Sequence, residues 1–252
     1  MRAVRRAGDV PAPGLFGADG WTPLQMNGLC SWWGAHTGLA DEGAGAVLRD
    51  LGPGGFHLTA AGSPTIEHPA LLGYRPALRL PSTPSYFTSG TLASTSAASG
   101  NKKTAYAVVV MEVTTQHHAL VCKGTSDANE EFTWLPLNDT TTYLDCGGAS
   151  PYMQSGGGSY DALTAYVMTA RADNTLGWRL RRNGTVVSSG SPGVPSASGT
   201  GPLQLGGGRE GAQQQALRGW IAEGAYFTTG HTDAEMTYVE RRLGARYGIT
   251  VL

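Results

Sequence analysis

The sequence contains few charged residues and no long apolar run. Charged residues make up 15% of the 252 residues, against about 25% in typical globular proteins. The formal net charge is -1, so the chain lacks the excess of positive charge that is typical of nucleic-acid-binding proteins. No apolar run reaches the roughly 18 residues that a membrane-spanning helix needs. We therefore expect neither a nucleic acid nor a membrane as a partner.

Cysteine and export signals are also sparse. Cys30, Cys122 and Cys146 are odd in number and far apart, which gives no disulfide framework. A bridge between Cys122 and Cys146 and a set of buried thiols in a reducing compartment both stay open. The N-terminus has positive charge but no apolar stretch followed by a small-residue cleavage site. We expect a chain that is made in a cytoplasm and is not exported by the secretory route.

Glycine is abundant, with 37 residues, about twice its average share. Apolar residues make up 40% and there are six tryptophans, which argues against disorder. Short β-branched and aromatic runs alternate with turn residues, a pattern typical of an all-β protein. Strands are expected at residues 29–33, 56–60, 77–80, 85–88, 105–113, 119–122, 131–135, 141–146, 163–171, 176–182, 185–188, 202–205 and 217–227. Residues 147–161 are expected to form a glycine-rich loop.

Two local signals predict particular structures. Asn183-Gly184 is typical of a two-residue hairpin turn, because a type I′ turn needs positive φ at both positions. Apolar residues at spacings of three, four and four predict one helix over residues 232–247. Thr232 with Glu235 fits a capping box, and Gly248 stands where a glycine ends a helix.

The chain divides into an N-terminal arm and one domain. Residues 1–26 are rich in proline, glycine and alanine and predict an extended arm. Arg2, Arg5 and Arg6 make its start basic. The arm is either a flexible terminus or a segment that docks on a neighbouring subunit. Residues 27–252 contain no linker and are expected to form one domain.

Several motifs follow one another in a fixed order. They are SWWGA at 31–35, LRDLGPGGFHLT at 48–59, GYRPALRL at 73–80, WRLRRNG at 178–184, PLQLGG at 202–207 and LRGWIAEGAYF at 217–227. This series resembles the concanavalin A-like lectin/glucanase superfamily, most closely the laminin G-like modules of phage and microbial surface proteins. The resemblance implies a jelly-roll β-sandwich of two antiparallel sheets, here with one C-terminal α-helix, and rim loops that bind sugars. The family's turn serine is replaced by Gly52, a change that a tight turn tolerates.

Catalytic motifs are not found in the sequence. Glucanases of this superfamily carry Glu-x-Asp-x-x-Glu on one strand, which aims two carboxylates at one glycosidic bond. That run is absent, and so is the Gly-x-Ser-x-Gly motif of a nucleophilic serine. Glu223 and Glu131 are the residues that a divergent glycan hydrolase would use. We expect no enzymatic activity and assign no catalytic residue.

Ligand-binding candidates lie in the middle of the chain. Sugar sites combine an aromatic platform with a few polar groups. Trp134, Tyr143 and Tyr152 are the aromatic candidates, and Asp127 and Asn129 are polar candidates nearby. For Trp134, packing in the core is the alternative to ligand binding.

Metal and cofactor signals are weak. His117 and His118 are adjacent, so they would point to opposite faces of a strand, and no Cys-x-x-Cys pair occurs. We assign no metal ligand and no cofactor. Calcium binding stays an open alternative. Residues 123–130 and 138–140 contain Asp, Asn, Ser and Thr, whose oxygens can bind calcium. The same residue types are common in turns, where their side chains hydrogen-bond to the backbone.

The sequence reading favours a non-enzymatic surface module of a phage virion, either a capsid decoration or a tail protein. Such a protein would lie at the virion surface, contact other virion subunits through its arm as part of an oligomer or assembly, and bind glycans. A free carbohydrate-binding lectin is the first alternative, and a divergent glycan hydrolase is the second.

Overall fold

The computed structural model describes most of the chain. The described residues are 20–37, 39–40, 45–81, 85–92, 102–112, 118, 120–124, 132–136, 141–145, 152–156, 160–191, 200–207 and 216–252. For residues 132–136, 141–143, 145 and 152–156 it describes the backbone.

The described residues form two antiparallel sheets and one α-helix, which confirms the predicted all-β class. Sheet A has, in spatial order, β15 (Thr185–Gly190), β14 (Trp178–Arg182), β13 (Ala165–Ala172), β8 (Lys103–Met111), β17 (Gly219–Phe227), β6 (Ala77–Leu80) and β5 (Thr65–Glu67), with β1 (Leu29–Gly34) also paired to β17. Sheet B has β12 (Tyr152–Gly156), β11 (Thr141–Asp145), β10 (Phe132–Pro136), β9 (Val121–Lys123), β16 (Leu203–Leu205), β7 (Tyr86–Thr88), β4 (Leu58–Ala61), β3 (Val47–Leu48) and β2 (Leu39–Ala40). Helix α2 spans Asp233–Tyr247, and short 3₁₀ turns occur at η1 (Pro23–Gln25), η2 (Ala35–Thr37) and η3 (Ala70–Leu72).

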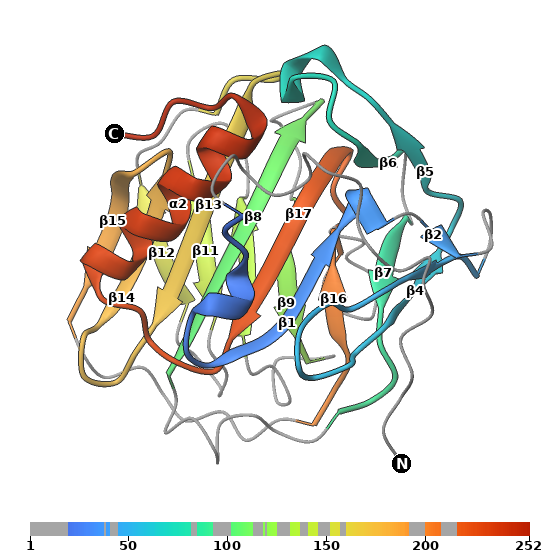
Figure 1. Cartoon of the computed structure of the whole chain (residues 1–252). Helices are drawn as coiled ribbons and strands as arrows, with labels where there is room; N and C mark the ends of the chain where they lie inside the picture. The colour runs from blue at the N-terminus through green and yellow to red at the C-terminus, as the bar shows by residue number, and fades with distance from the viewer. Residues whose placement is uncertain are drawn as a thin grey trace.

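Strand β8 is buried along its whole length, because sheet A is covered on both faces. Ala107 and Val109 belong to the core between the two sheets. Val108 and Val110 belong to a second core between sheet A and α2. Figure 1 shows α2 lying across the front of sheet A. A strand buried on both faces reads as a continuous apolar run, which explains the row of valines in the sequence.

Helix α2 begins and ends where the sequence predicts. The Thr232 side chain accepts a hydrogen bond from the Glu235 backbone N–H at 3.3 Å, and the Glu235 carboxylate accepts one from the Thr232 backbone N–H at 2.7 Å. The two bonds form the predicted capping box. Gly248 has a φ of 70° and ends the helix in the left-handed region.

A turn held by Asp50 carries one of the sequence motifs. Its Oδ1 accepts hydrogen bonds from the backbone N–H groups of Trp32 at 2.8 Å and Gly52 at 2.7 Å, and its Oδ2 accepts one from Phe56 N–H at 2.7 Å. A Cβ atom at position 52 would lie 2.8 Å from the Cα of Ser31. Glycine therefore fits this turn, as expected, and the close approach of two backbones leaves no room for a side chain there.

The described residues contain four strands that the sequence did not predict, β2, β3, β5 and β12, all at or next to sheet edges. Residues Tyr152–Gly156 form strand β12 within the segment that was expected to be a loop. β12 is the edge strand, paired with β11 alone. Its sequence, YMQSG, lacks the alternation of apolar and polar residues that predicts a strand, and glycines surround it in the chain.

The last residues of the predicted arm pack on the domain. Trp21 is 3% exposed, and its ring meets Tyr238 of α2 edge-on with ring centres 6.1 Å apart. The Trp21 carbonyl accepts a hydrogen bond from Arg246 Nη2 at 2.9 Å. Arg2, Arg5 and Arg6 lie outside the described residues.

We expect Gly52→Ala to destabilise the protein, because its new Cβ must displace the backbone of β1. The free energy of unfolding should fall by about 1–3 kcal/mol. Gly90→Ala is the control, since nothing lies within 4 Å of a Cβ atom there. Urea unfolding of both variants checks the prediction, and an equal stability of the two would contradict it.

Candidate functional site

Glu223 of β17 is tied into a buried ion pair beneath α2. Its Oε1 accepts hydrogen bonds from Trp32 Nε1 and from Arg246 Nη1, both at 2.7 Å. Its Oε2 accepts from Arg246 Nη1 at 2.6 Å and from the Tyr247 hydroxyl at 3.0 Å. Glu223 is 2% exposed. With both oxygens engaged away from solvent, Glu223 anchors the helix and does not fit the role of a catalytic acid.

A second buried carboxylate anchors the other half of the helix. Glu240 of α2 is fully buried. Its Oε1 accepts a hydrogen bond from the Thr169 hydroxyl at 2.6 Å, and its Oε2 lies 3.0 Å from Arg181 Nη2. Burial raises the pKa of Glu240 to about 7, although the Thr169 hydrogen bond and the Arg181 charge both act to lower it. The helix is thus held to sheet A by two buried ion pairs.

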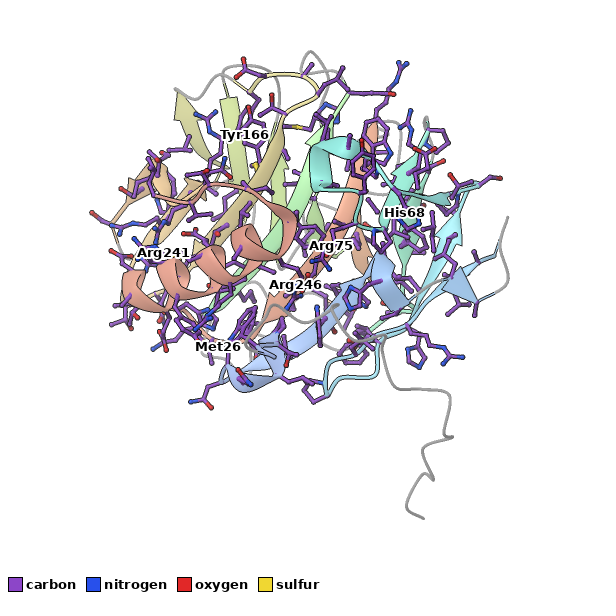
Figure 2. The ribbon with its side chains drawn as sticks, turned by 45° about the horizontal axis from the view of Figure 1, so that its top comes forward. Met26, His68, Arg75, Tyr166, Arg241 and Arg246 are labelled. Carbon is purple, nitrogen blue, oxygen red and sulfur yellow. The ribbon has the colours of Figure 1, made fainter. Side chains whose placement is uncertain are left out.

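The outer face of sheet A is therefore closed where α2 lies on it. Arg171 of β13 adds to this contact, because its Nη1 donates to the His231 carbonyl at 2.9 Å and to Asp233 Oδ1 at 3.1 Å. Figure 2 shows Arg246 where the helix meets the sheet. A ligand has no access to this part of the sheet.

The outer face of sheet B carries a row of polar residues. Cross-strand partners share one face of a sheet. The register of successive strands places in one row Tyr152, Asp145, Thr133, Cys122, Gln204, Thr88 and Thr59. The alternate positions Val121, Leu205 and Phe87 belong to the core between the sheets. The row therefore lies on the face of sheet B that points away from the core; we call it the outer row.

Gln204 stands at the middle of the outer row. It is 2% exposed, and its Oε1 has no hydrogen-bond partner among the residues that the structure describes. Thr88 and Tyr86 on the same face are half-buried, and Thr59 is exposed. A buried acceptor without a donor costs about 1–3 kcal/mol, so its presence needs an explanation.

The register separates the aromatic candidates of the sequence. Trp134 pairs with Leu144 on one side and Val121 on the other, both fully buried core residues. The register therefore places Trp134 in one row with core residues, and its role stays a prediction. Tyr152 belongs to the outer row, and Tyr143 shares its face, because it stands two residues from Asp145 on β11.

The remaining candidates fall outside the described residues. These are Asp127, Asn129 and Glu131. Gln204 and Thr88 were missed, although a signal for Gln204 exists. It is the single polar residue between Leu203 and Leu205, and such alternation predicts a strand with one face turned away from the core.

The described part of the chain offers neither a metal site nor a membrane-spanning helix. There, no group of three or more His, Cys, Asp or Glu side chains could hold a metal ion. No helix there is long and apolar enough to cross a membrane. Cys122 is a buried thiol that donates to the Gly124 carbonyl at 3.7 Å, and Cys146 is not among these residues.

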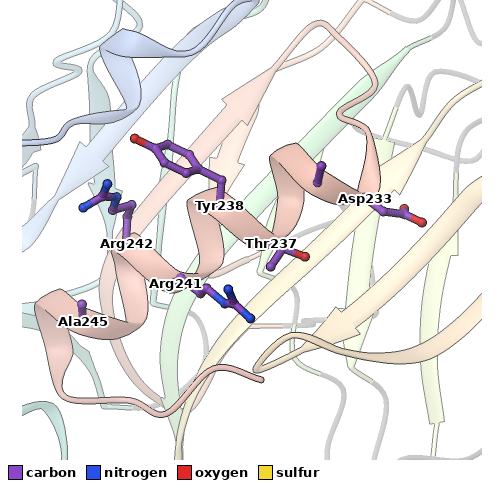
Figure 3. Close-up of a pocket in the computed structure, with 7 residues that line it drawn as sticks. Asp233, Thr237, Tyr238, Arg241, Arg242 and Ala245 are labelled. Atoms are coloured by element: carbon purple, nitrogen blue, oxygen red, sulfur yellow. The ribbon is translucent and has the colours of Figure 1, made fainter.

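A shallow depression lies on the exposed face of α2. Figure 3 shows Tyr238 and Arg241 pointing to opposite sides of the helix. All seven residues that line the depression come from α2 itself. No second element of the described chain forms a wall, so a ligand would stay largely in solvent. Ligand pockets bury most of their ligand's surface, and we do not take this depression as the site.

Comparison with known proteins gives structural matches alone, since no family model and no curated protein matches the chain. Trypanosoma rangeli sialidase in complex with sialic acid is similar with a TM-score of 0.59 and 14% identity, over 88% of this chain and 34% of that chain. A mutant of that sialidase displaying trans-sialidase activity has a TM-score of 0.62 and 12% identity, over 89% and 34%. The binding domain of botulinum neurotoxin DC in complex with SialylT has a TM-score of 0.59 and 7% identity, over 86% and 52%.

The matches show a β-sandwich fold. The chain spans about a third of the sialidase chains and about half of the neurotoxin domain chain. The finer assignment to concanavalin A-like, laminin G-like modules stays a prediction. None of these three proteins is described as a virion component, so the virion role, the surface location and the assembly partners also stay predictions.

The expectation of a non-enzymatic protein is corrected by the sialidase matches. Chains that contain this fold include enzymes, so a β-sandwich without the glucanase motif is no ground for excluding activity. At 12% and 14% identity the likeness shows the fold alone, and the reaction of the sialidases is a property of those proteins.

Arg246→Ala should destabilise the protein strongly, because it leaves Glu223 charged and buried without its partner. We expect a loss of about 3–5 kcal/mol in the free energy of unfolding. Arg241→Ala, an exposed position on the same helix, is the matched control and should change it by less than about 0.5 kcal/mol. Urea denaturation measures both. A comparable loss in the two variants would show that Glu223–Arg246 is not an anchor.

The raised pKa of Glu240 predicts a pH-dependent stability. The folded protein keeps the Glu240 proton up to about pH 7, whereas an ordinary Glu releases it near 4.5. Between these values the folded state binds more protons, so the stability contributed by Glu240 falls as pH rises. Relative to Glu240→Gln, the wild type should lose up to about 3 kcal/mol between pH 4.5 and 8. Thermal and urea unfolding across this range test it, and a difference that stays constant or grows with pH would refute it.

Proposed function

We propose that this protein binds glycans through the outer face of sheet B. The observation that carries the proposal is Gln204, a buried acceptor in the outer row for which the described residues provide no donor. Thr59 and Thr88 add hydroxyl groups to the same face, and Tyr86 adds an aromatic ring. Sugar recognition uses this combination, since hydroxyls need hydrogen-bond partners and the ring face needs an apolar surface.

The covering of the outer face of sheet A by helix α2 also favours sheet B as the binding face. The helix covers that face of sheet A with apolar packing and two buried ion pairs. Sheet B carries its exposed polar residues on the side away from the core. A saccharide can therefore lie along the strands of sheet B without displacing a helix.

The similar structures support a saccharide as the ligand class. One is a sialidase in complex with sialic acid, and another is a neurotoxin binding domain in complex with SialylT. Glycans that end in sialic acid are therefore the first probes, together with neutral glycans of the same backbone.

The test is a glycan array followed by calorimetric titration of the glycan that binds best. Gln204→Met removes the acceptor at similar length, and should weaken binding about five- to tenfold by the loss of one hydrogen bond. It should leave the free energy of unfolding unchanged or higher, because a buried acceptor without a donor disappears.

Two strand threonines provide a matched pair for the same titration. Thr59→Val lies on the outer face of sheet B and should weaken binding. Thr65→Val, on the exposed edge strand of sheet A, should not. A blank array for the wild type, or wild-type affinity in Gln204→Met, would overturn the proposal.

A further inference from the structure

A loop at the edge of sheet A presents an exposed tyrosine in a strained conformation. Residues 68–75 join β5 to β6 around η3. Tyr74 is 72% exposed. Its φ is 58°, in the left-handed region that disfavours side chains with a Cβ atom. Strain of this kind persists where the surroundings hold it, often at binding sites.

The loop is held by its own hydrogen bonds and by one buried side chain. Tyr74 N–H donates to the Pro69 carbonyl and Arg75 N–H to the Leu72 carbonyl, both at 3.1 Å. Leu72 is fully buried in the core beneath α2. The Tyr74 carbonyl lies 3.1 Å from His68 Nδ1. The ring of Tyr74 is therefore carried on an ordered loop, which reduces the entropy lost when a ligand binds.

The chemistry of the loop surface fits a neutral sugar ring. The Tyr74 carbonyl can only accept, so a neutral His68 donates from Nδ1 and keeps Nε2 as an acceptor. Leu71, 44% exposed, adds apolar surface beside the turn. A pyranose offers an apolar C–H face to an aromatic ring and hydroxyl donors at its rim.

We infer that Tyr74 and His68 form a second saccharide contact, in which the Tyr74 ring stacks on a neutral pyranose and His68 Nε2 accepts one of its hydroxyls. The inference rests on the proposed glycan binding and adds a contact away from sheet B. It also explains why a tyrosine stands where glycine would be relaxed: the ring is retained for the ligand.

The experiment follows backbone amide signals by NMR during titration with lactose, cellobiose and chitobiose. At least one of these disaccharides should shift the amides of residues 73–75. Tyr74→Gly should weaken that binding about five- to tenfold or more, because the stacked ring is lost, while its urea midpoint rises because strain is relieved. Tyr74→Phe should bind like the wild type, since it keeps the ring. Tyr238→Ala, which removes another partly exposed tyrosine, should also leave the affinity unchanged.

The amides of Phe87 and Leu205, on strands of sheet B, separate the two proposals in the same titration. Shifts there without shifts at residues 73–75 would overturn the second contact and leave the proposed function standing. Shifts at residues 73–75 without shifts in sheet B would support the second contact and overturn the site of the proposed function. Equal affinity of Tyr74→Gly and wild type, or no shift with any of the three sugars, would overturn the inference.

Discussion

The docking of helix α2 on sheet A is the constraint on which the rest of the structure depends. Two buried ion pairs, Glu223–Arg246 and Glu240–Arg181, hold the helix over strands β13, β8 and β17. Each pair has further hydrogen-bond partners, which offset part of the cost of burying these side chains. Because of this contact, β8 is buried on both faces and the fold has two cores instead of one.

The consequence for function is an asymmetry between the two sheets. Sheet A is an internal layer wherever the helix covers it. Glu223, one of the two carboxylates that a divergent glycan hydrolase would use, anchors the helix to the sheet. Sheet B turns polar side chains away from the core, with Gln204 lacking a donor among the described residues. The face that can meet a ligand is therefore decided by which sheet the helix covers.

Local features of this fold could be predicted from the sequence, and long-range ones could not. The Asn183-Gly184 turn, the Thr232 capping box and the valine-rich strand β8 are each specified by neighbouring residues. The role of Glu223 depends on Trp32, 191 residues away in the chain, and no local pattern encodes such a pairing. The same is true of the candidate binding residues. Trp134 and Tyr152 are both aromatic, and only the strand register shows that they lie at positions on opposite faces of sheet B. Alternation of apolar and polar residues shows that one face of a strand points away from the core, but it does not show in which of the two sheets the strand lies.

The most direct test of the account is a hydrogen–deuterium exchange footprint of the protein with and without its bound glycan. The account predicts that the ligand slows exchange of backbone amides in β4, β7 and β16 of sheet B. Amides of α2 and of the strands beneath it should exchange at unchanged rates. Protection centred on α2, with unchanged exchange in sheet B, would contradict the assignment of the binding face.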